Sequence, residues 1–182
     1  MTEVVRLTLV AHAMTDAMAA ARFPGDEPLN DVGRRQAEAA GSDFRCGACH
    51  FTGPEGRARQ TADLLGLDAT VDPRLADLNC GPWQGKRLQD VPCGDLMVWL
   101  TDPARAPHGG ESIADLIQRV DRWLNSLTEN AAATVAVTHP AVIRAAILLA
   151  LDAPAKSFWR MDIAPVSRTA LHYRGGCWTL RR

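Results

Sequence analysis

Two histidines stand where a buried strand is expected to end and a helix to begin. His12 closes the apolar run of residues 5–12 (VRLTLVAH), and His139 closes residues 134–139 (TVAVTH). Runs with so few polar residues are typical of parallel strands buried on both faces. Ligands of open α/β folds bind at the carboxyl ends of such strands, so one sheet edge is expected to receive both imidazoles. Two core histidines are the alternative, but their position at the ends of the runs favours a shared site.

An arginine is expected close to a bound anion. Pro54 suits the first turn of a helix that Gly66 would end, and Arg57 then falls in that first turn. Free backbone N–H groups and the helix dipole favour an anion there, and a guanidinium adds a bidentate contact. The alternative is a solvated surface charge, which is the commonest fate of an arginine.

The order of elements around these residues predicts an α/β fold, a three-layer sandwich with a mostly parallel central sheet and helices on both faces. After the first strand, Asn30 or Asp31 can cap a helix that stops near Gly41, and an apolar segment at 46–52 can form a second strand. Ser112 precedes an amphipathic helix, and Pro140 can start a long apolar one. Two short strands are expected around residues 175–176. Residues 71–108, interrupted by five prolines, read as an irregular lid or rim.

Composition excludes several classes of function. The chain has 182 residues, of which 47% are hydrophobic and 23% charged, and a formal net charge of −1, so one domain over residues 1–182 is expected. No basic surface for nucleic acid, membrane-spanning stretch or export signal is apparent, and we expect a cytoplasmic protein. The oligomeric state is open, a homodimer being one possibility.

A cysteine pair raises a separate question about cofactors. Cys46, Cys49 and His50 match the pattern of c-type haem attachment, and a zinc or redox site is a second reading. No second close cysteine pair completes a zinc site, and five cysteines in a chain without an export signal indicate reduced thiols. A buried strand through Cys49, His50 and Phe51 is therefore favoured, and no cofactor or metal is expected.

Six segments, in order, resemble the histidine phosphatase superfamily, also called phosphoglycerate-mutase-like. Residues 9–13 (LVAHA) resemble its LVRHG, residues 28–37 resemble PLTxxGxxQA, and residues 57–62 (RARQTA) resemble RAxQTA. Residues 73–85 are similar to PRLxExxxGxWxG, and GES at 110–112 and VTH at 137–139 complete the set. Each segment alone is weak, whereas the six together cover nearly the whole chain.

The resemblance implies a phosphatase that works through a phosphohistidine and needs no metal. His12 would be the nucleophile, Arg57 and His139 would hold phosphate oxygens, and Asp77 would protonate the leaving oxygen. The expected partner is a small phosphorylated metabolite, as for broad-specificity or α-ribazole phosphatases; a mutase is disfavoured because the stretch before His139 is short. Further candidate substrate-binding residues are Thr15, Arg22, Gly25, His108, Glu111 and Arg144.

The chain departs from the family pattern at its most charged positions. Ala11 replaces the arginine of LVRHG and Ala13 its glycine, Met18 stands where many members have asparagine, and Pro140 follows the second histidine in place of glycine. Loss of one transition-state donor typically lowers the rate by about 10²- to 10³-fold. The alternative function is therefore an impaired member that binds a phosphorylated ligand or a protein partner.

Overall fold

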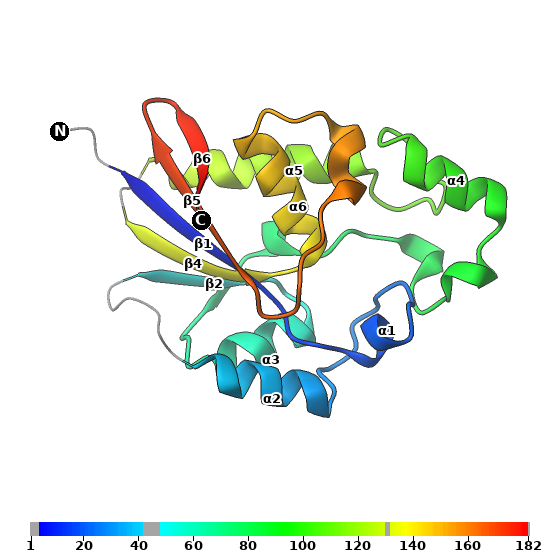
Figure 1. The fold of residues 1–182 in the computed structure, drawn as a ribbon, viewed down its shortest axis with the longest axis horizontal. Helices are drawn as coiled ribbons and strands as arrows, with labels where there is room; N and C mark the ends of the chain where they lie inside the picture. The colour runs from blue at the N-terminus through cyan, green and yellow to red at the C-terminus, as the bar shows by residue number, and fades with distance from the viewer. Residues whose placement is uncertain (1–3, 42–47, 130–131, 182) are drawn as a thin grey trace.

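The computed structural model describes residues 4–41, 48–129 and 132–181. These residues form a six-stranded sheet in the order β3-β2-β4-β1-β5-β6 (Figure 1). The strands are β1 (Val5–Ala11), β2 (Cys49–Thr52), β3 (Thr70–Val71), β4 (Ala133–Thr138), β5 (Arg168–Arg174) and β6 (Cys177–Arg181). Neighbours from β3 to β1 are parallel, and β5 and β6 add antiparallel pairs at the other edge. The predicted α/β class with a mostly parallel central sheet is confirmed.

Helices cover both faces of this sheet. Helices α2 (Asp31–Ala40) and α3 (Gly56–Leu64) lie on one face, and α5 (Ile113–Leu127) and α6 (Pro140–Ala150) pack together on the other (Figure 1). The short α1 (Asp16–Ala19) and α4 (Cys93–Thr101) lie beyond the carboxyl end of β1. Four 3₁₀ helices complete the described elements: η1 (Pro73–Leu75), η2 (Gly81–Trp83), η3 (Leu88–Asp90) and η4 (Ala155–Arg160).

Polar caps begin two of the predicted helices where expected. The Asn30 side chain accepts a hydrogen bond from the Gly33 N–H at 2.9 Å and begins α2, which ends at Gly41. The Ser112 hydroxyl accepts from the Asp115 N–H at 3.1 Å and begins α5. The predicted apolar stripe of α5 is buried at Ile113, Leu116, Val120 and Leu124.

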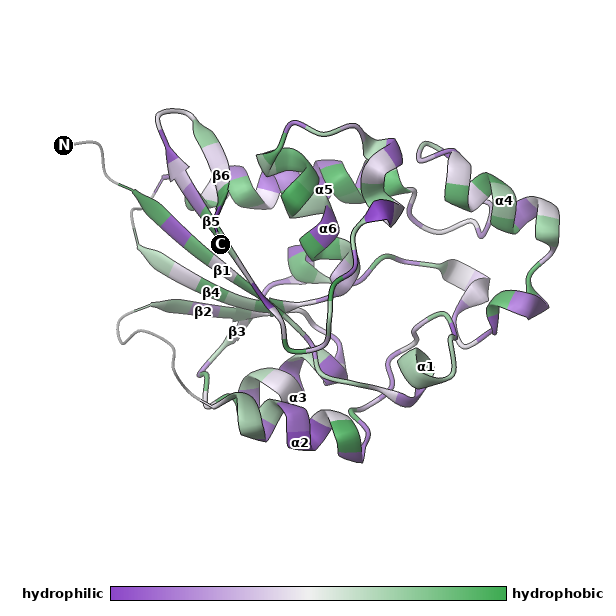
Figure 2. Cartoon of the chain, in the orientation of Figure 1, coloured by the Kyte–Doolittle hydropathy of each residue, from purple (hydrophilic) through white to green (hydrophobic). Residues whose placement is uncertain are grey.

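The core explains why the central strands lack polar residues. Leu7 and Leu9 of β1 pack into the cluster under α5 and α6, while Val10 packs with Ala58 and Ala62 of α3 on the opposite face. β1 and β4 are accordingly hydrophobic over most of their length (Figure 2). Both strands are buried on two faces, as their sequences predict. None of the described helices is long and apolar enough to cross a bilayer.

Two segments differ from the sequence-based expectation. The region from 71 to 108 contains the short elements expected, but also the nine-residue helix α4, which fits between Pro92 and Pro103 and buries Trp99. The second strand forms, yet Cys49 is exposed and only Thr52 is fully buried, because β3 is two residues long and pairs only with Phe51 and Thr52. Cys46 lies outside the described residues.

Candidate active site

The register of β1 and β4 brings the two histidines together. Ala11 pairs with Thr138 as the last residues of parallel neighbours, so the next residue of each strand leaves the sheet at the same edge. The His12 N–H donates to the Thr138 carbonyl at 2.9 Å, and the two imidazole centroids lie 5.1 Å apart. The prediction that both rings reach one place is confirmed.

His12 is held as a neutral ring with one nitrogen free. Its Nδ1 lies 2.8 Å from the Ala13 carbonyl, which can only accept, so Nδ1 carries the proton and Nε2 keeps its lone pair. The side chain is 3% exposed. Burial is the largest cause that lowers the pKa of His12, and together with the nearby His139 and Arg57 it brings this pKa to about 3. A neutral, unprotonated Nε2 is the form in which an imidazole can attack an electrophile.

This depressed pKa predicts acid-sensitive stability. Between about pH 6.5 and pH 3 the unfolded chain protonates His12 and the folded chain does not, so the free energy of unfolding decreases as the pH falls through this range. Above about pH 6.5 His12 is mostly neutral in both the folded and the unfolded chain, and its protonation no longer lowers the free energy of unfolding. We expect urea denaturation to show that, between pH 7 and pH 5, the free energy of unfolding decreases by about 2 kcal/mol more in the wild type than in His12→Gln. An equal loss in both proteins would contradict the assigned pKa.

Arg57 is buried at the same edge, so the alternative of a solvated surface charge does not hold for it. It lies in the first turn of α3 and is 1% exposed. Nη2 donates to Asp77 Oδ2 at 2.6 Å, Nη1 donates to the Gly25 carbonyl, and Glu27 Oε2 lies 3.9 Å from Nη1. The buried Nε has no hydrogen-bond partner within the described part of the chain.

Asp77 connects the arginine with the second histidine. Its side chain is 13% exposed, and Oδ2 lies 3.5 Å from Nδ1 of His139. Burial raises the pKa of Asp77, but His139, Arg57 and His12 together lower it below its usual range, so the carboxylate is ionised without a ligand.

The loop that carries Asp77 is fixed by a charged clamp. Arg119 on α5 donates to the Arg74 carbonyl at 2.8 Å and to the Ala76 carbonyl at 2.9 Å. Glu111 accepts two hydrogen bonds from this guanidinium, at 2.8 and 2.7 Å. Glu111, a candidate for substrate binding, therefore stabilises the Asp77 loop and does not line the cavity described below.

Glu55 is a site residue that the sequence analysis missed. Its Oε2 accepts from Nε2 of His139 at 2.7 Å, and its Oε1 accepts from the Asp77 N–H at 2.9 Å. Burial raises the pKa of Glu55, but hydrogen bonding to His139 outweighs this and leaves the pKa below its usual range. Gly53 permits this contact, since a Cβ there would lie 2.9 Å from Nε2 of His139. In the sequence, the signal that could have pointed to Glu55 is its position as a carboxylate two residues before Arg57.

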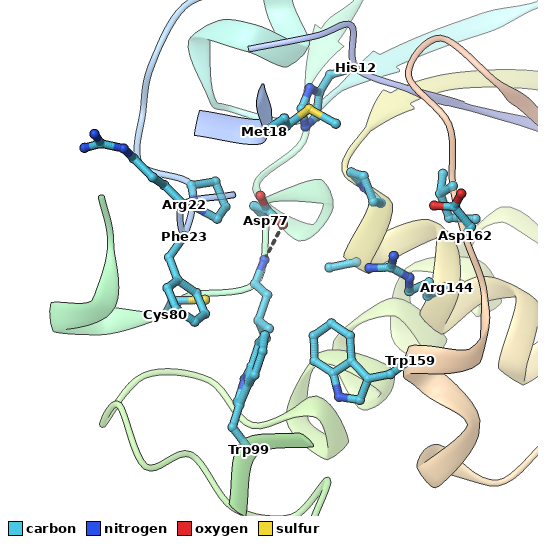
Figure 3. Close-up of a pocket in the computed structure, with 15 residues that line it drawn as sticks. His12, Met18, Arg22, Phe23, Asp77, Cys80, Trp99, Arg144, Trp159 and Asp162 are labelled. Atoms are coloured by element: carbon cyan, nitrogen blue, oxygen red, sulfur yellow. Dashed lines mark hydrogen bonds between the residues drawn. The ribbon is translucent and has the colours of Figure 1, made fainter. Parts of the chain in front are cut away.

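A cavity of about 290 Å³ opens beside His12 and Asp77. Figure 3 shows His12 at one end, Trp99 and Trp159 at the other, and Asp77 and Arg144 on opposite walls between them. Most of the lining is apolar: Met18, Phe23, Pro24, Leu78, Trp99, Pro140, Ala141, Trp159 and Ile163. Arg22, Cys80 and Asp162 complete it. The cavity suits a ligand with a polar end near His12 and an apolar body.

Most of the other candidate substrate-binding residues lie outside the cavity. Arg22 lines the cavity, but its guanidinium points away from His12 (Figure 3). Thr15 is buried and caps α1, and the Gly25 N–H donates to Glu27 at 2.7 Å. His108 packs edge-on against Trp83 with centroids 5.1 Å apart, and burial lowers its pKa. Besides His12, Arg57, Asp77 and His139, six candidates were predicted, and of these only Arg22 and Arg144 line the cavity.

Metal ligands do not gather in the described part of the chain. Within residues 4–41, 48–129 and 132–181, no group of three or more histidine, cysteine or acidic side chains is placed to hold a metal ion. Cys49 is a free, exposed thiol. Residue 46, the other cysteine of the pair, is outside these ranges, so the zinc and haem readings stay hypotheses.

Two imidazoles, a buried guanidinium and a carboxylate at the carboxyl edge of this sheet define a protein of the histidine phosphatase type. The model of the histidine phosphatase superfamily (branch 1) matches residues 7–182, and the chain belongs to this family.

Similar proteins differ in length and in their assigned activities. The bifunctional protein Rv2228c of Mycobacterium tuberculosis is 33% identical over 192 residues, covering 97% of this chain and 52% of that protein. The chain thus spans about half the length of this relative. A probable phosphoglycerate mutase, GpmB, of Yersinia pestis is 30% identical over 189 residues, covering 96% of this chain and 87% of that protein. The structure of a mycobacterial glucosyl-3-phosphoglycerate phosphatase with VO3 superposes with a TM-score of 0.84 at 29% identity, covering 97% of both chains.

Proposed function

We propose that this protein hydrolyses phosphomonoesters of small metabolites through a phosphohistidine on His12. The observation that carries the proposal is the state of His12: a neutral imidazole with Nδ1 tied to a carbonyl, at one end of a cavity that Asp77 also lines. The phosphatase activity of the mycobacterial structural relative supports it.

In the first step, Nε2 of His12 attacks phosphorus and the bond to the leaving oxygen breaks. Nδ1 keeps its proton, and the Ala13 carbonyl stabilises the positive charge that develops on the ring. Arg57 Nε and His139 Nδ1 are buried nitrogens without hydrogen-bond partners in the described structure, and a phosphoryl oxygen would accept from Arg57 Nε. The Arg57 guanidinium would offset charge on the transferred group, and His139 would help to position it.

Asp77 would supply the proton for the leaving oxygen. Without ligand it is ionised and paired with Arg57. A bound phosphate would compete for Arg57 and place negative charge beside the carboxylate, and both effects raise the pKa of Asp77. Ligand binding would thereby create the general acid that the first step needs. In the second step the resulting carboxylate takes a proton from water, which attacks the phosphohistidine and releases phosphate and His12.

Missing donors limit the rate that this site can reach. Ala11 is fully buried in the core and Pro140 has no N–H, so neither replaces the donors of the family pattern. Three carboxylates, Glu27, Glu55 and Asp77, also lie within 4 Å of the Arg57 guanidinium or the His139 imidazole. These features favour, as a second candidate, a protein that binds a phosphorylated ligand with little or no turnover.

Rapid mixing with a panel of phosphomonoesters would separate the two candidates. Hydrolysis predicts release of inorganic phosphate and, after acid-free quenching, a chain that carries one acid-labile phosphoryl group on His12. Saturable binding without phosphate release or an adduct would favour the second candidate instead. Absence of release, adduct and binding across the panel would contradict both.

Glu55→Gln tests the hydrogen bond to His139. The glutamine keeps the size of the side chain but has one accepting oxygen, so it can accept from only one of the two donors, and it loses the charge that faces the ring. Because hydrogen bonds to charged groups contribute about 1.5–3 kcal/mol, kcat should decrease by about 10- to 100-fold. Steady-state kinetics at several pH values provide the measurement, and the urea midpoint shows whether folding changes. An unchanged kcat and pH profile would show that Glu55 does not act through His139.

A further inference from the structure

Arg144 places a fixed positive charge on the cavity wall. It lies on α6, and its Nε donates to the Met161 carbonyl at 2.8 Å. The guanidinium packs on two rings, with its carbon 5.8 Å from the Phe158 centroid and 5.6 Å from the Trp159 centroid. A hydrogen bond and two aromatic contacts therefore set the plane of this guanidinium without any charged partner.

The two terminal nitrogens of Arg144 are available to a ligand. In the described structure the side chain forms a hydrogen bond only through Nε, and no carboxylate lies within ion-pair distance. Figure 3 shows the guanidinium directed into the cavity, opposite Asp77. Burial lowers the pKa of Arg144, which Asp162 and Asp77 partly offset, and an arginine keeps its charge after such a shift.

Apolar surroundings increase the effect of this charge. Trp159 packs against the guanidinium, and Trp99 and Ile163 also line the cavity; such walls exclude water and reduce screening. A half-buried cation without a counter-ion gains most from an anion that offers two oxygens to its planar donor fork. The second anion would be separate from the phosphoryl group, because His12 lies at the end of the cavity (Figure 3).

We propose that Arg144 binds a second anionic group, a carboxylate or a second phosphate, on the alcohol part of the substrate. This rests on the proposed function only in placing the transferred phosphoryl at His12. The preferred substrate is thus a phosphomonoester with an apolar body and an anionic substituent.

Asp162 is the feature that could reverse this preference. Its carboxylate also lines the cavity, and it would favour a cationic substituent. It is exposed to solvent and forms no ion pair with Arg144, so water screens its charge more strongly. The Arg144 guanidinium is half-buried against the Phe158 and Trp159 rings, so water screens its charge less. We therefore assign the selectivity to Arg144.

Matched aromatic esters provide the test. Hydrolysis of phenyl phosphate is compared with that of its 3-carboxy, 4-carboxy and 4-aminomethyl derivatives and of a bis-phosphate, benzene-1,4-diyl bisphosphate. At least one ester with a second anionic group should show a kcat/KM about 10-fold or more above that of phenyl phosphate, as expected for a charge-assisted bidentate contact. In Arg144→Met this ratio should fall to about one, and Arg144→Lys should retain part of it. The identity of the preferred ester shows whether Arg144 binds a carboxylate or a second phosphate.

Binding and control variants separate this inference from the proposed function. The corresponding phenylphosphonates cannot be hydrolysed, and calorimetry should show tighter binding of an anionic derivative to the wild type but not to Arg144→Met. Arg160→Met, which removes an exposed arginine of η4 that does not line the cavity, should leave every ratio unchanged.

The possible outcomes distinguish the two proposals. Phenyl phosphate hydrolysis without any anion preference, a preference for the aminomethyl ester, or a preference that survives Arg144→Met would overturn this inference and leave the phosphatase intact. Selective phosphonate binding without hydrolysis would support Arg144 and contradict the phosphatase.

Discussion

Replacing His12 by alanine is expected to lower phosphate release by at least about 10³-fold and to abolish the phosphorylated intermediate. The reason is that His12 offers the unprotonated imidazole nitrogen that lines the cavity, its Nδ1 proton being held by the Ala13 carbonyl. Phosphate release with the best ester of the panel is the measurement, and mass spectrometry of the intact chain detects the adduct.

His12→Gln is the matched control for packing, because it fills more of the buried volume that alanine would leave. Both variants should lose activity to a similar extent while differing in their urea midpoints. A variant that retains the wild-type rate would show that another group attacks phosphorus, and the proposed mechanism would then be wrong.

Asp77→Asn is expected to have an effect that depends on the leaving group. For alkyl phosphates, which need a proton on the departing oxygen, we expect kcat to decrease by about 10²- to 10⁴-fold. The first step with p-nitrophenyl phosphate should be much less affected, because p-nitrophenolate leaves without a proton. Since the second step still needs a base, the variant should show a burst of p-nitrophenolate and accumulate phosphorylated His12.

A general loss of structure would produce a different result. Asp77 also contacts Arg57 and His139, so removal of its charge disturbs the site. Asp77→Glu keeps a carboxylate and should recover part of the alkyl phosphatase activity. Equal losses with alkyl and p-nitrophenyl phosphates, and no burst, would indicate that Asp77 holds the site together without transferring a proton.

The sequence was sufficient for the part of the fold that depends on periodicity and caps. Long apolar runs defined β1 and β4, and Asn30 and Ser112 marked the starts of α2 and α5. The meeting of His12 and His139 followed from the rule that parallel strands end at one edge. Arg57 was predicted correctly near this edge because it occupies a helix first turn.

Contacts between distant segments could not be predicted in the same way. Glu55 reaches His139 across 84 positions, and Arg119 holds the Asp77 loop from α5, so neither contact leaves a local pattern. His108 and Glu111 are near the motifs in sequence, but Trp83 and Arg119 respectively engage them. Helix α4 was missed because prolines at both ends concealed it within an irregular segment.

The separation of the site into two sets of elements has a consequence for how such proteins diversify. The groups proposed to react come from strand ends, α3 and the loop after η1, whereas Trp99 and Trp159 come from α4 and η4, outside the central sheet. If the proposed function holds, mutations in these peripheral segments would change which alcohol is accepted without moving His12 or Arg57. The range of substrates would then diversify while the chemical centre stays the same.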